Sequence, residues 1–262
     1  MSIRIFHDLS FFAEDRFAME IGQEEIISVG LVLTLLLLSR VRDLLDNSGL
    51  FAATITGLTV SLLGHWTWLI TLLSFLVIGS LATKWKLEEK KLLSVEEANE
   101  GLRGWRNVLA NGGAVSIIAL YNFISPGEEW IYFAAIASIS VALSDTLASE
   151  IGSLDVRTRS ITTLKSVPAG TNGGMSPTGT VAALFGAILI SFIGMVFSPE
   201  NSTIPEFTLF ILLTIIGWLG CQIDSLLGAL LENRGYLGKH SVNFLATLSG
   251  SLMAIFSYHQ FL

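Results

Sequence analysis

Residues 130–151 read WIYFAAIASISVALSDTLASEI, and this run is the strongest indication of the fold. It holds only two charged residues, Asp145 and Glu150, and as a helix it is long enough to cross the ~30 Å hydrocarbon core of a bilayer. The rest of the chain has the same character, because 52% of its 262 residues are hydrophobic and only 14% are charged. A typical soluble domain has roughly 25% charged residues. The composition therefore predicts an all-α, polytopic membrane protein.

The chain contains eight apolar stretches of helical length. They cover residues 24–39, 48–64, 67–83, 106–124, 130–151, 177–197, 207–231 and 242–261. Proline disrupts a helix interior, and four of the five prolines fall between these stretches, while Pro177 falls at the start of one. We therefore predict a helical bundle of about eight spans, forming a single transmembrane domain over residues 24–262. The first stretch is short, so seven spans with a re-entrant or interfacial segment is the alternative.

The distribution of positive charge predicts the orientation of the bundle. With eight spans, one set of alternating connections holds thirteen of the fifteen Lys and Arg residues, and the other holds only Arg4 and Arg16. Cytoplasmic connections carry the excess of Lys and Arg, so we expect both termini outside and the long polar loops inside. Residues 1–23 mix Phe and Ile with acids and lack the pattern of a signal or transit peptide, so we expect an interfacial amphipathic helix there.

Two aspartates lie near the predicted cytoplasmic ends of their helices. Asp145 is followed by Ser149 and Gly152 on one helical face, and Asp224 is followed by Gly228 and Glu232 in the same way. Each aspartate lies six or seven residues before its helix end, so both carboxylates are expected at one depth, roughly 10 Å from that end. Mg²⁺ prefers carboxylate oxygens together with substrate phosphates, so the pair predicts a magnesium site. The alternative is that each aspartate bonds a neighbouring polar group and joins helices.

The loop between the fifth and sixth spans is rich in glycine. Its residues Gly170, Gly173 and Gly174 allow the backbone to approach an anion closely, and Thr171 and Asn172 lie between them. Ser176 followed by Pro177 is typical of a helix start, whose amides and dipole attract anions. With Lys165 nearby, the loop predicts a phosphate-binding site. The alternative is a flexible loop with an ordinary helix cap.

A third group of polar residues lies at the start of the fourth span. Arg103, Asn107 and Asn111 repeat every four residues, and Arg106 lies one turn from Arg103. They could bind a phosphate, a ribose or a base. The alternative is a pair of snorkelling arginines with amide bonds between helices. We also expect a solvated surface helix within residues 84–103 and a close-packing face along Gly179, Gly186 and Gly194.

Several classes of function are disfavoured. The net charge is −7 and no basic cluster is paired with exposed aromatic residues, so we expect no binding to nucleic acid. The single cysteine, Cys221, excludes an internal disulfide and a cysteine-based zinc site. Acidic residues, a phosphate loop and basic residues in one layer at the cytoplasmic face are typical of phosphoryl or nucleotidyl transfer, and the membrane setting implies a reactant with a lipid tail.

Four stretches resemble the signatures of an integral membrane family known as domain of unknown function ninety-two. They are RNVLANGG at 106–113, DTLASEIG at 145–152, the loop at 161–176, and DSLLGA at 224–229, and the resemblance covers about residues 25–260. The family includes human transmembrane protein nineteen and a plant phytyl-phosphate kinase. The resemblance therefore implies transfer of a phosphoryl group from a nucleoside triphosphate to an isoprenyl monophosphate. It also implies CTP, before ATP, as the first nucleotide to test.

The resemblance also implies roles for individual residues. Asp145 and Asp224 would be metal-binding and catalytic carboxylates, with Glu150 supporting the metal. The phosphate loop would comprise Lys165, Gly170, Thr171, Asn172, Gly173 and Gly174, with Asn107 and Asn111 lining the site. With no transit peptide in view, we expect a prokaryotic plasma membrane. The rival functions are a cytidylyltransferase acting on a lipid phosphate and a carrier for lipid phosphates or ions.

Overall fold

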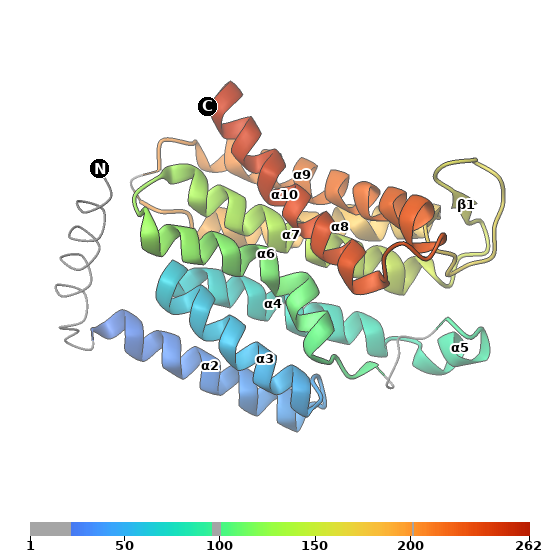
Figure 1. Cartoon of the computed structure of the whole chain (residues 1–262), viewed down its shortest axis with the longest axis horizontal. Coiled ribbons are helices and arrows are strands. Elements are labelled where there is room, and N and C mark those ends of the chain that lie inside the picture. Colours follow the sequence, from blue (N-terminus) through green and yellow to red (C-terminus); the bar gives the residue numbers. More distant parts are fainter. Residues whose placement is uncertain (1–21, 96–100, 201) are drawn as a thin grey trace.

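The computed structural model describes residues 22–95, 101–200 and 202–262. All eight predicted stretches form helices, which lie side by side along the long axis of the molecule (Figure 1). Seven of the helices in the described part are long and apolar enough to cross a membrane. The predicted interfacial helix at 1–23 lies almost entirely outside the described residues.

The seven helices begin and end within three residues of the predicted bounds. They are α3 (Asn47–Leu58) with a π-helical turn at Thr59–Gly64, α4 (Trp66–Lys84), α6 (Trp105–Ile124), α7 (Glu129–Gly152), α8 (Pro177–Val196), α9 (Glu206–Leu227) with a π-helical turn at Gly228–Glu232, and α10 (Lys239–Phe261). The eighth stretch forms α2 (Gln23–Val41), which carries Glu24 and Glu25 in its first turn and Arg40 in its last. Because α2 is only 19 residues long, every 18-residue segment of it contains all three charges, and it is not among the seven helices apolar enough to span, in agreement with the lower of the two predicted span numbers.

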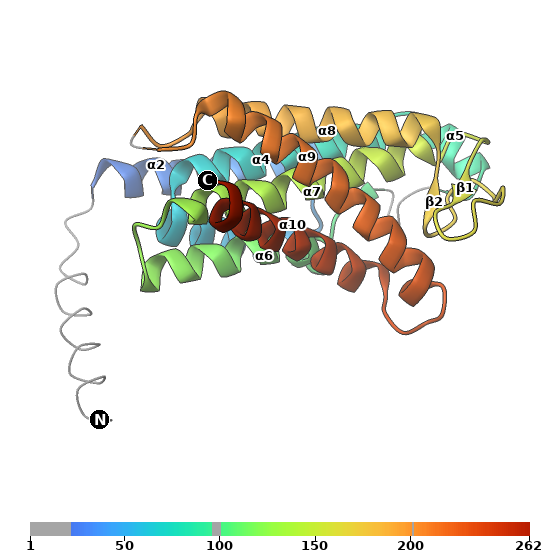
Figure 2. The same ribbon diagram turned by 90° about the horizontal axis from the view of Figure 1, so that it is seen from above.

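Helix α7 forms the centre of the bundle. It packs against α4, α6, α8, α9 and α10 (Figure 2). Within its 18-residue apolar segment, 89% is buried inside the protein. A helix that is apolar on all sides is buried on all sides, and the Ala and Ser residues of α7 let its neighbours approach closely. Ser144 and Ser140 donate hydrogen bonds to the Ala183 and Leu213 carbonyls of α8 and α9, 2.7 and 3.3 Å away.

Glycines on the surrounding helices allow this close packing. A Cβ atom at Gly186 would lie 2.9 Å from the Leu143 carbonyl oxygen, and one at Gly220 would lie 2.2 Å from Val141. Gly179 and Gly194 also pack directly on α7. The predicted close-packing face of α8 is therefore confirmed.

The long polar connections gather at one end of the bundle. The short helix α5 (Leu87–Leu92) and the hairpin of β1 (Arg159–Ser160) and β2 (Gly174–Met175) lie at this end, whereas the C-terminus lies at the opposite one (Figure 1). We call it the polar end. Its orientation toward the cytoplasm stays a prediction.

Candidate active site

A cavity of about 500 Å³ opens at the polar end of the bundle. Its walls come from the ends of α7, α8, α9 and α10, and the loop between α7 and α8 and the residues after α5 complete it. Nine of the residues predicted to form the site line this cavity: Asp145, Glu150, Gly170, Thr171, Asn172, Gly173, Gly174, Ser176 and Asp224.

The two aspartates meet in the cavity. Asp145 from α7 and Asp224 from α9 both line it and are close enough to interact electrostatically. The Oδ2 atom of Asp224 is buried and has no hydrogen-bond partner. A buried carboxylate oxygen normally has a partner, because leaving it without one costs free energy. The position of both aspartates in one cavity agrees with the prediction that their carboxylates lie at the same depth.

Lys239 supplies a positive charge at the cavity. It is the first residue of α10, lines the cavity, and interacts electrostatically with Asp224 and Glu232. Glu232 also interacts with the Asn172 side chain of the loop. Sequence reasoning counted Lys239 only among the basic residues of the polar connections. The available signal was its place at the start of a helix that follows the Asp224 motif after a short turn.

The glycine-rich loop is packed against the end of α9. Gly170 and Gly173 have φ values of +79° and +73°, which favour glycine. A Cβ atom at Gly173 would lie 2.4 Å from the Ala229 Cβ and 2.7 Å from the Ser225 carbonyl oxygen. The Asn233 side chain also donates to the Asn172 carbonyl oxygen at 3.0 Å. The loop is therefore fixed beside Asp224.

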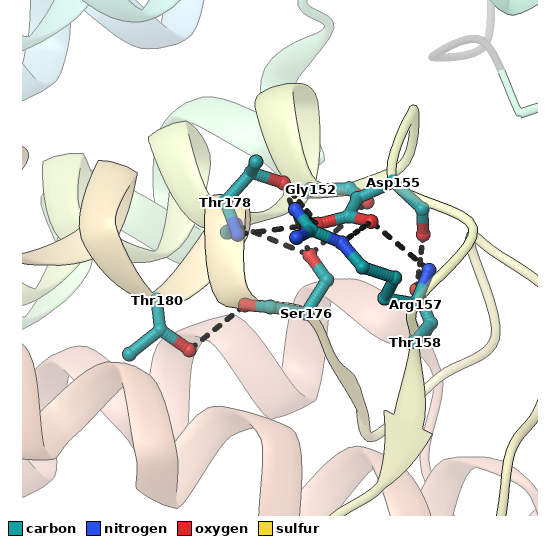
Figure 3. Close-up of polar contacts among 8 residues, drawn as sticks. Gly152, Asp155, Arg157, Thr158, Ser176, Thr178 and Thr180 are labelled. Atoms are coloured by element: carbon teal, nitrogen blue, oxygen red, sulfur yellow. Dashed lines mark hydrogen bonds and ion pairs between the residues drawn. The ribbon is translucent and has the colours of Figure 1, made fainter.

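The N-terminus of α8 is capped by groups of the chain itself (Figure 3). Ser176 is the N-cap and accepts from the Gly179 amide, as predicted, with Pro177 in the first turn. Asp155 accepts from the amide and the hydroxyl of Thr178 at 3.3 and 2.8 Å. These amides already have acceptors, so an anion in the cavity would rely on the glycine-rich loop and Lys239 instead.

Asp155 is a structural residue that sequence reasoning missed. The Arg157 side chain donates two hydrogen bonds to it, each of 2.9 Å, and together with the Arg157 amide and Thr178 it holds the pKa of Asp155 well below its usual range. The carboxylate therefore joins the α7–α8 loop to the start of α8. Its spacing from Ser176 gives no local sequence signal for this contact.

Glu150 has a different role from the one predicted for it. Its two carboxylate oxygens accept from the Lys90 ammonium at 2.6 Å and from the Thr83 hydroxyl at 2.8 Å. Lys90 is fully buried and also donates to the Ala82 and Thr83 carbonyls at the end of α4. Both oxygens are thus engaged, so Glu150 supports the fold at the cavity wall and does not join the aspartates. The solvated surface helix expected within residues 84–103 is present as α5, but its Lys90 is buried and not solvated.

The remaining predicted residues lie outside the cavity lining. Arg103 is buried against the Phe75 ring, 5.1 Å from its centroid, and Arg106 lies over Trp105. Asn111 donates to the Asn107 carbonyl and side-chain oxygens within α6. Lys165 is exposed on the β1–β2 loop. The structure therefore does not bring these five residues together with the aspartates.

The cavity suits a divalent cation that also binds phosphate. Within the described ranges, no three His, Cys, Asp or Glu side chains are grouped to hold a metal ion. Mg²⁺ needs no such cage, because it commonly binds one or two carboxylates together with substrate phosphates and water. Asp145 and the unpartnered oxygen of Asp224 fit this donor set.

Comparison with known proteins places the chain in a family. Residues 30–251 match the family described as integral membrane protein DUF92. An uncharacterized membrane protein of Methanocaldococcus jannaschii is 33% identical, over 88% of this chain and 93% of that protein. One of Synechocystis is 30% identical, over 82% of this chain and 83% of that protein. The chloroplastic protein VTE6 of Arabidopsis thaliana is 31% identical, over 77% of this chain and 65% of VTE6.

No solved structure matches the chain. The family match covers most of the transmembrane domain, including every residue that lines the cavity. The protein is therefore a multi-pass integral membrane protein of the DUF92 family.

Proposed function

We propose that the protein is a prenyl phosphate kinase. It would transfer a phosphoryl group from a nucleoside triphosphate, with CTP favoured over ATP, to an isoprenyl monophosphate. The observation that carries the proposal is the cavity at the polar end of a membrane bundle, where Asp145, Asp224 and Lys239 lie beside a glycine-rich loop. The resemblance of these motifs to a family that includes a phytyl-phosphate kinase supports it.

The reaction needs positioning more than it needs a protein nucleophile. A phosphate oxygen of the lipid attacks the γ-phosphorus of the nucleotide, and a new P–O bond forms. The bond from the γ-phosphorus to the bridging oxygen breaks, and the nucleoside diphosphate leaves with the electron pair. The attacking phosphate is already anionic, so the main task is to orient two anions and balance their charge.

The cavity residues fit these tasks. Asp145 and Asp224 would hold Mg²⁺, which neutralises the charge on the transferred phosphoryl group. Lys239 would face the phosphates directly as a point charge. The loop residues Gly170–Gly174 would present backbone groups, and their contacts with the end of α9 would keep them in place.

The membrane location of the reaction follows from the same arrangement. The lipid would enter from the bilayer between helices, and the nucleotide would enter from the water at the polar end. We propose that this end faces the cytoplasm, as the charge distribution predicts, and that the membrane is a prokaryotic plasma membrane. Relatives of similar length in Methanocaldococcus jannaschii and Synechocystis support a prokaryotic setting.

The proposal is tested with purified protein in detergent. Mg²⁺, geranylgeranyl phosphate and CTP labelled at the γ-phosphate are incubated with the protein, and the lipids are then separated. Labelled prenyl diphosphate is the expected product. Release of pyrophosphate with the label on it would indicate a cytidylyltransferase. No nucleotide consumption with geranylgeranyl, phytyl or farnesyl phosphate would contradict both transfer reactions and favour a carrier.

A further inference from the structure

We propose that an apolar groove between α9 and α10 holds the hydrocarbon chain of the lipid substrate. The inference rests on the proposed function and adds a binding site to it. The groove has a volume of about 330 Å³ and is separate from the cavity. Its lining is apolar except for one serine: Leu212, Ile215, Ile216, Leu219, Leu252, Met253, Phe256 and Ser257.

The groove opens outward from the bundle. Ile215, Leu252 and Phe256 are all exposed in the protein alone. In a membrane this surface would face lipid, because α9 and α10 are both long and apolar enough to span it. An occupant therefore enters sideways from the bilayer, and its chemistry must be apolar to match the walls.

The same two helices connect the groove to the cavity. Ile215 in the groove and Gln222 in the cavity are seven residues apart, which places them on one side of α9. Ser257 in the groove and Asn243 in the cavity are fourteen residues apart, or about four turns, and so also lie on one side of α10. A chain lying along this seam would extend from one site toward the other.

The dimensions suit a molecule with one polar end. Leu219 lies five residues before Asp224 on the helix, or roughly 7.5 Å along its axis, and Leu212 lies roughly 18 Å away. A phosphate held near Lys239 would therefore have its chain in contact with the near end of the groove, and a longer chain would reach the far end. The match of charge at one end and apolar walls at the other fits an anionic head group on a long hydrocarbon chain, which under the proposed function is an isoprenyl monophosphate.

A kinetic comparison of two chain lengths tests the groove. Leu219→Trp would fill the groove with a side chain that the bilayer tolerates. The matched control is Leu184→Trp on α8, because Leu184 is 42% exposed and Leu219 is 40% exposed, and Leu184 lines neither site. For geranylgeranyl phosphate we expect Leu219→Trp to raise KM by about tenfold, equivalent to ~1.4 kcal/mol, without lowering kcat. For isopentenyl phosphate, whose chain is too short to extend beyond the near end of the groove, the increase in KM should be much smaller.

A labelling experiment does not depend on turnover. Geranylgeranyl phosphate with a photoreactive diazirine at the chain end is irradiated with the protein, and modified peptides are mapped by mass spectrometry. Label within residues 212–219 or 252–257, displaced by unmodified geranylgeranyl phosphate, supports the groove. Displaceable label on other helices, or an equal KM effect in Leu184→Trp, would contradict the groove as the chain-binding site. If the wild-type protein still turns over, the kinase proposal is unaffected. Absence of turnover in the wild-type protein overturns the kinase, and the labelling then decides the groove by itself.

Discussion

The acidic residues on two sides of the cavity differ in whether their carboxylate oxygens have partners. On one side of the cavity, Glu150 of α7 is paired with Lys90 of α5 and Thr83 of α4, which lie behind the cavity lining, and both of its oxygens are satisfied. On the wall formed by α7 and α9, Asp145 faces Asp224, and one Asp224 oxygen is buried without a partner. A satisfied ion pair maintains structure, whereas an unsatisfied carboxylate retains capacity for a ligand. The comparison distinguishes Glu150, which supports the structure, from the Asp145–Asp224 pair, which we propose binds the ligand.

Breaking the ion pair between Glu150 and Lys90 should have the largest effect on stability. Glu150→Gln leaves the Lys90 ammonium buried without a negative partner, and we expect a loss of about 3–5 kcal/mol in the free energy of unfolding. Reversible unfolding in mixed micelles measures this change. The double variant Lys90→Met, Glu150→Leu should recover most of the stability, because an apolar pair leaves no buried charge. A fully stable Glu150→Gln protein would show that the ion pair has no structural role.

Substitution of the two aspartates should have the opposite effect and should lower turnover but not stability. Asp224→Asn and Asp145→Asn remove charge from the cavity, and we expect turnover to fall by about 10²- to 10³-fold with unfolding unchanged or slightly improved. The lipid-phosphorylation assay and the unfolding assay are run on the same preparations. Wild-type rates in both variants would rule out the aspartates as the metal site.

The contact between the loop and α9 can be tested with a pair of glycines. Gly173 and Gly235 both have φ of +73°, but only Gly173 is enclosed, whereas nothing lies within 4 Å of a Cβ at Gly235. Gly235→Ala should cost about 1–2 kcal/mol from backbone strain alone. Gly173→Ala should cost more than that and should also lower turnover, since the loop must move away from Asp224. Equal effects on turnover would show that the close contact is unimportant.

The source of positive charge can be tested with two lysines. Lys239 lines the cavity, whereas Lys165 was expected there from the sequence but is exposed outside it. We expect Lys239→Met to raise the KM for nucleotide by about tenfold, as for the loss of one charge-assisted contact. Lys165→Met should stay within about twofold of the wild-type KM, because Lys165 is exposed and does not line the cavity. A larger increase in KM for Lys165→Met than for Lys239→Met would support the sequence-based prediction that Lys165 binds the phosphate.

The smallest effect concerns pH at the anchored loop. The lowered pKa of Asp155 means that its contribution to stability is present above the unfolded pKa of about 3.9 and is lost only as pH falls through the lower folded pKa. Hydrogen exchange at the Thr178 amide, corrected for its intrinsic pH dependence, should give the same protection at pH 7 and pH 5. Asp155→Asn should reduce this protection at both pH values. Protection that disappears between pH 7 and pH 5 would contradict the assignment.

Regular patterns in the sequence predicted the helices and the acidic pair. Apolar runs set the helix bounds, and equal spacing from two helix ends placed Asp145 and Asp224 in one cavity. Glu150 was assigned wrongly to the metal because its partner, Lys90, lies sixty residues earlier in a segment that reads as solvated surface. Lys239 was missed and the α6 stripe over-assigned for the same reason. Which face of a helix meets the cavity depends on long-range packing, and no local pattern encodes it.

The most direct test of the proposed site at Asp145 and Asp224 measures metal binding instead of turnover. Mn²⁺ replaces Mg²⁺ as a paramagnetic ion, and its electron paramagnetic resonance spectrum is recorded with CTP and either wild-type protein or Asp224→Asn, with the Lys90→Met, Glu150→Leu protein as the control. We predict a protein-bound Mn²⁺ signal that is retained in the control and lost in Asp224→Asn. Equal Mn²⁺ binding by the wild-type protein and Asp224→Asn would contradict a metal site at the two aspartates.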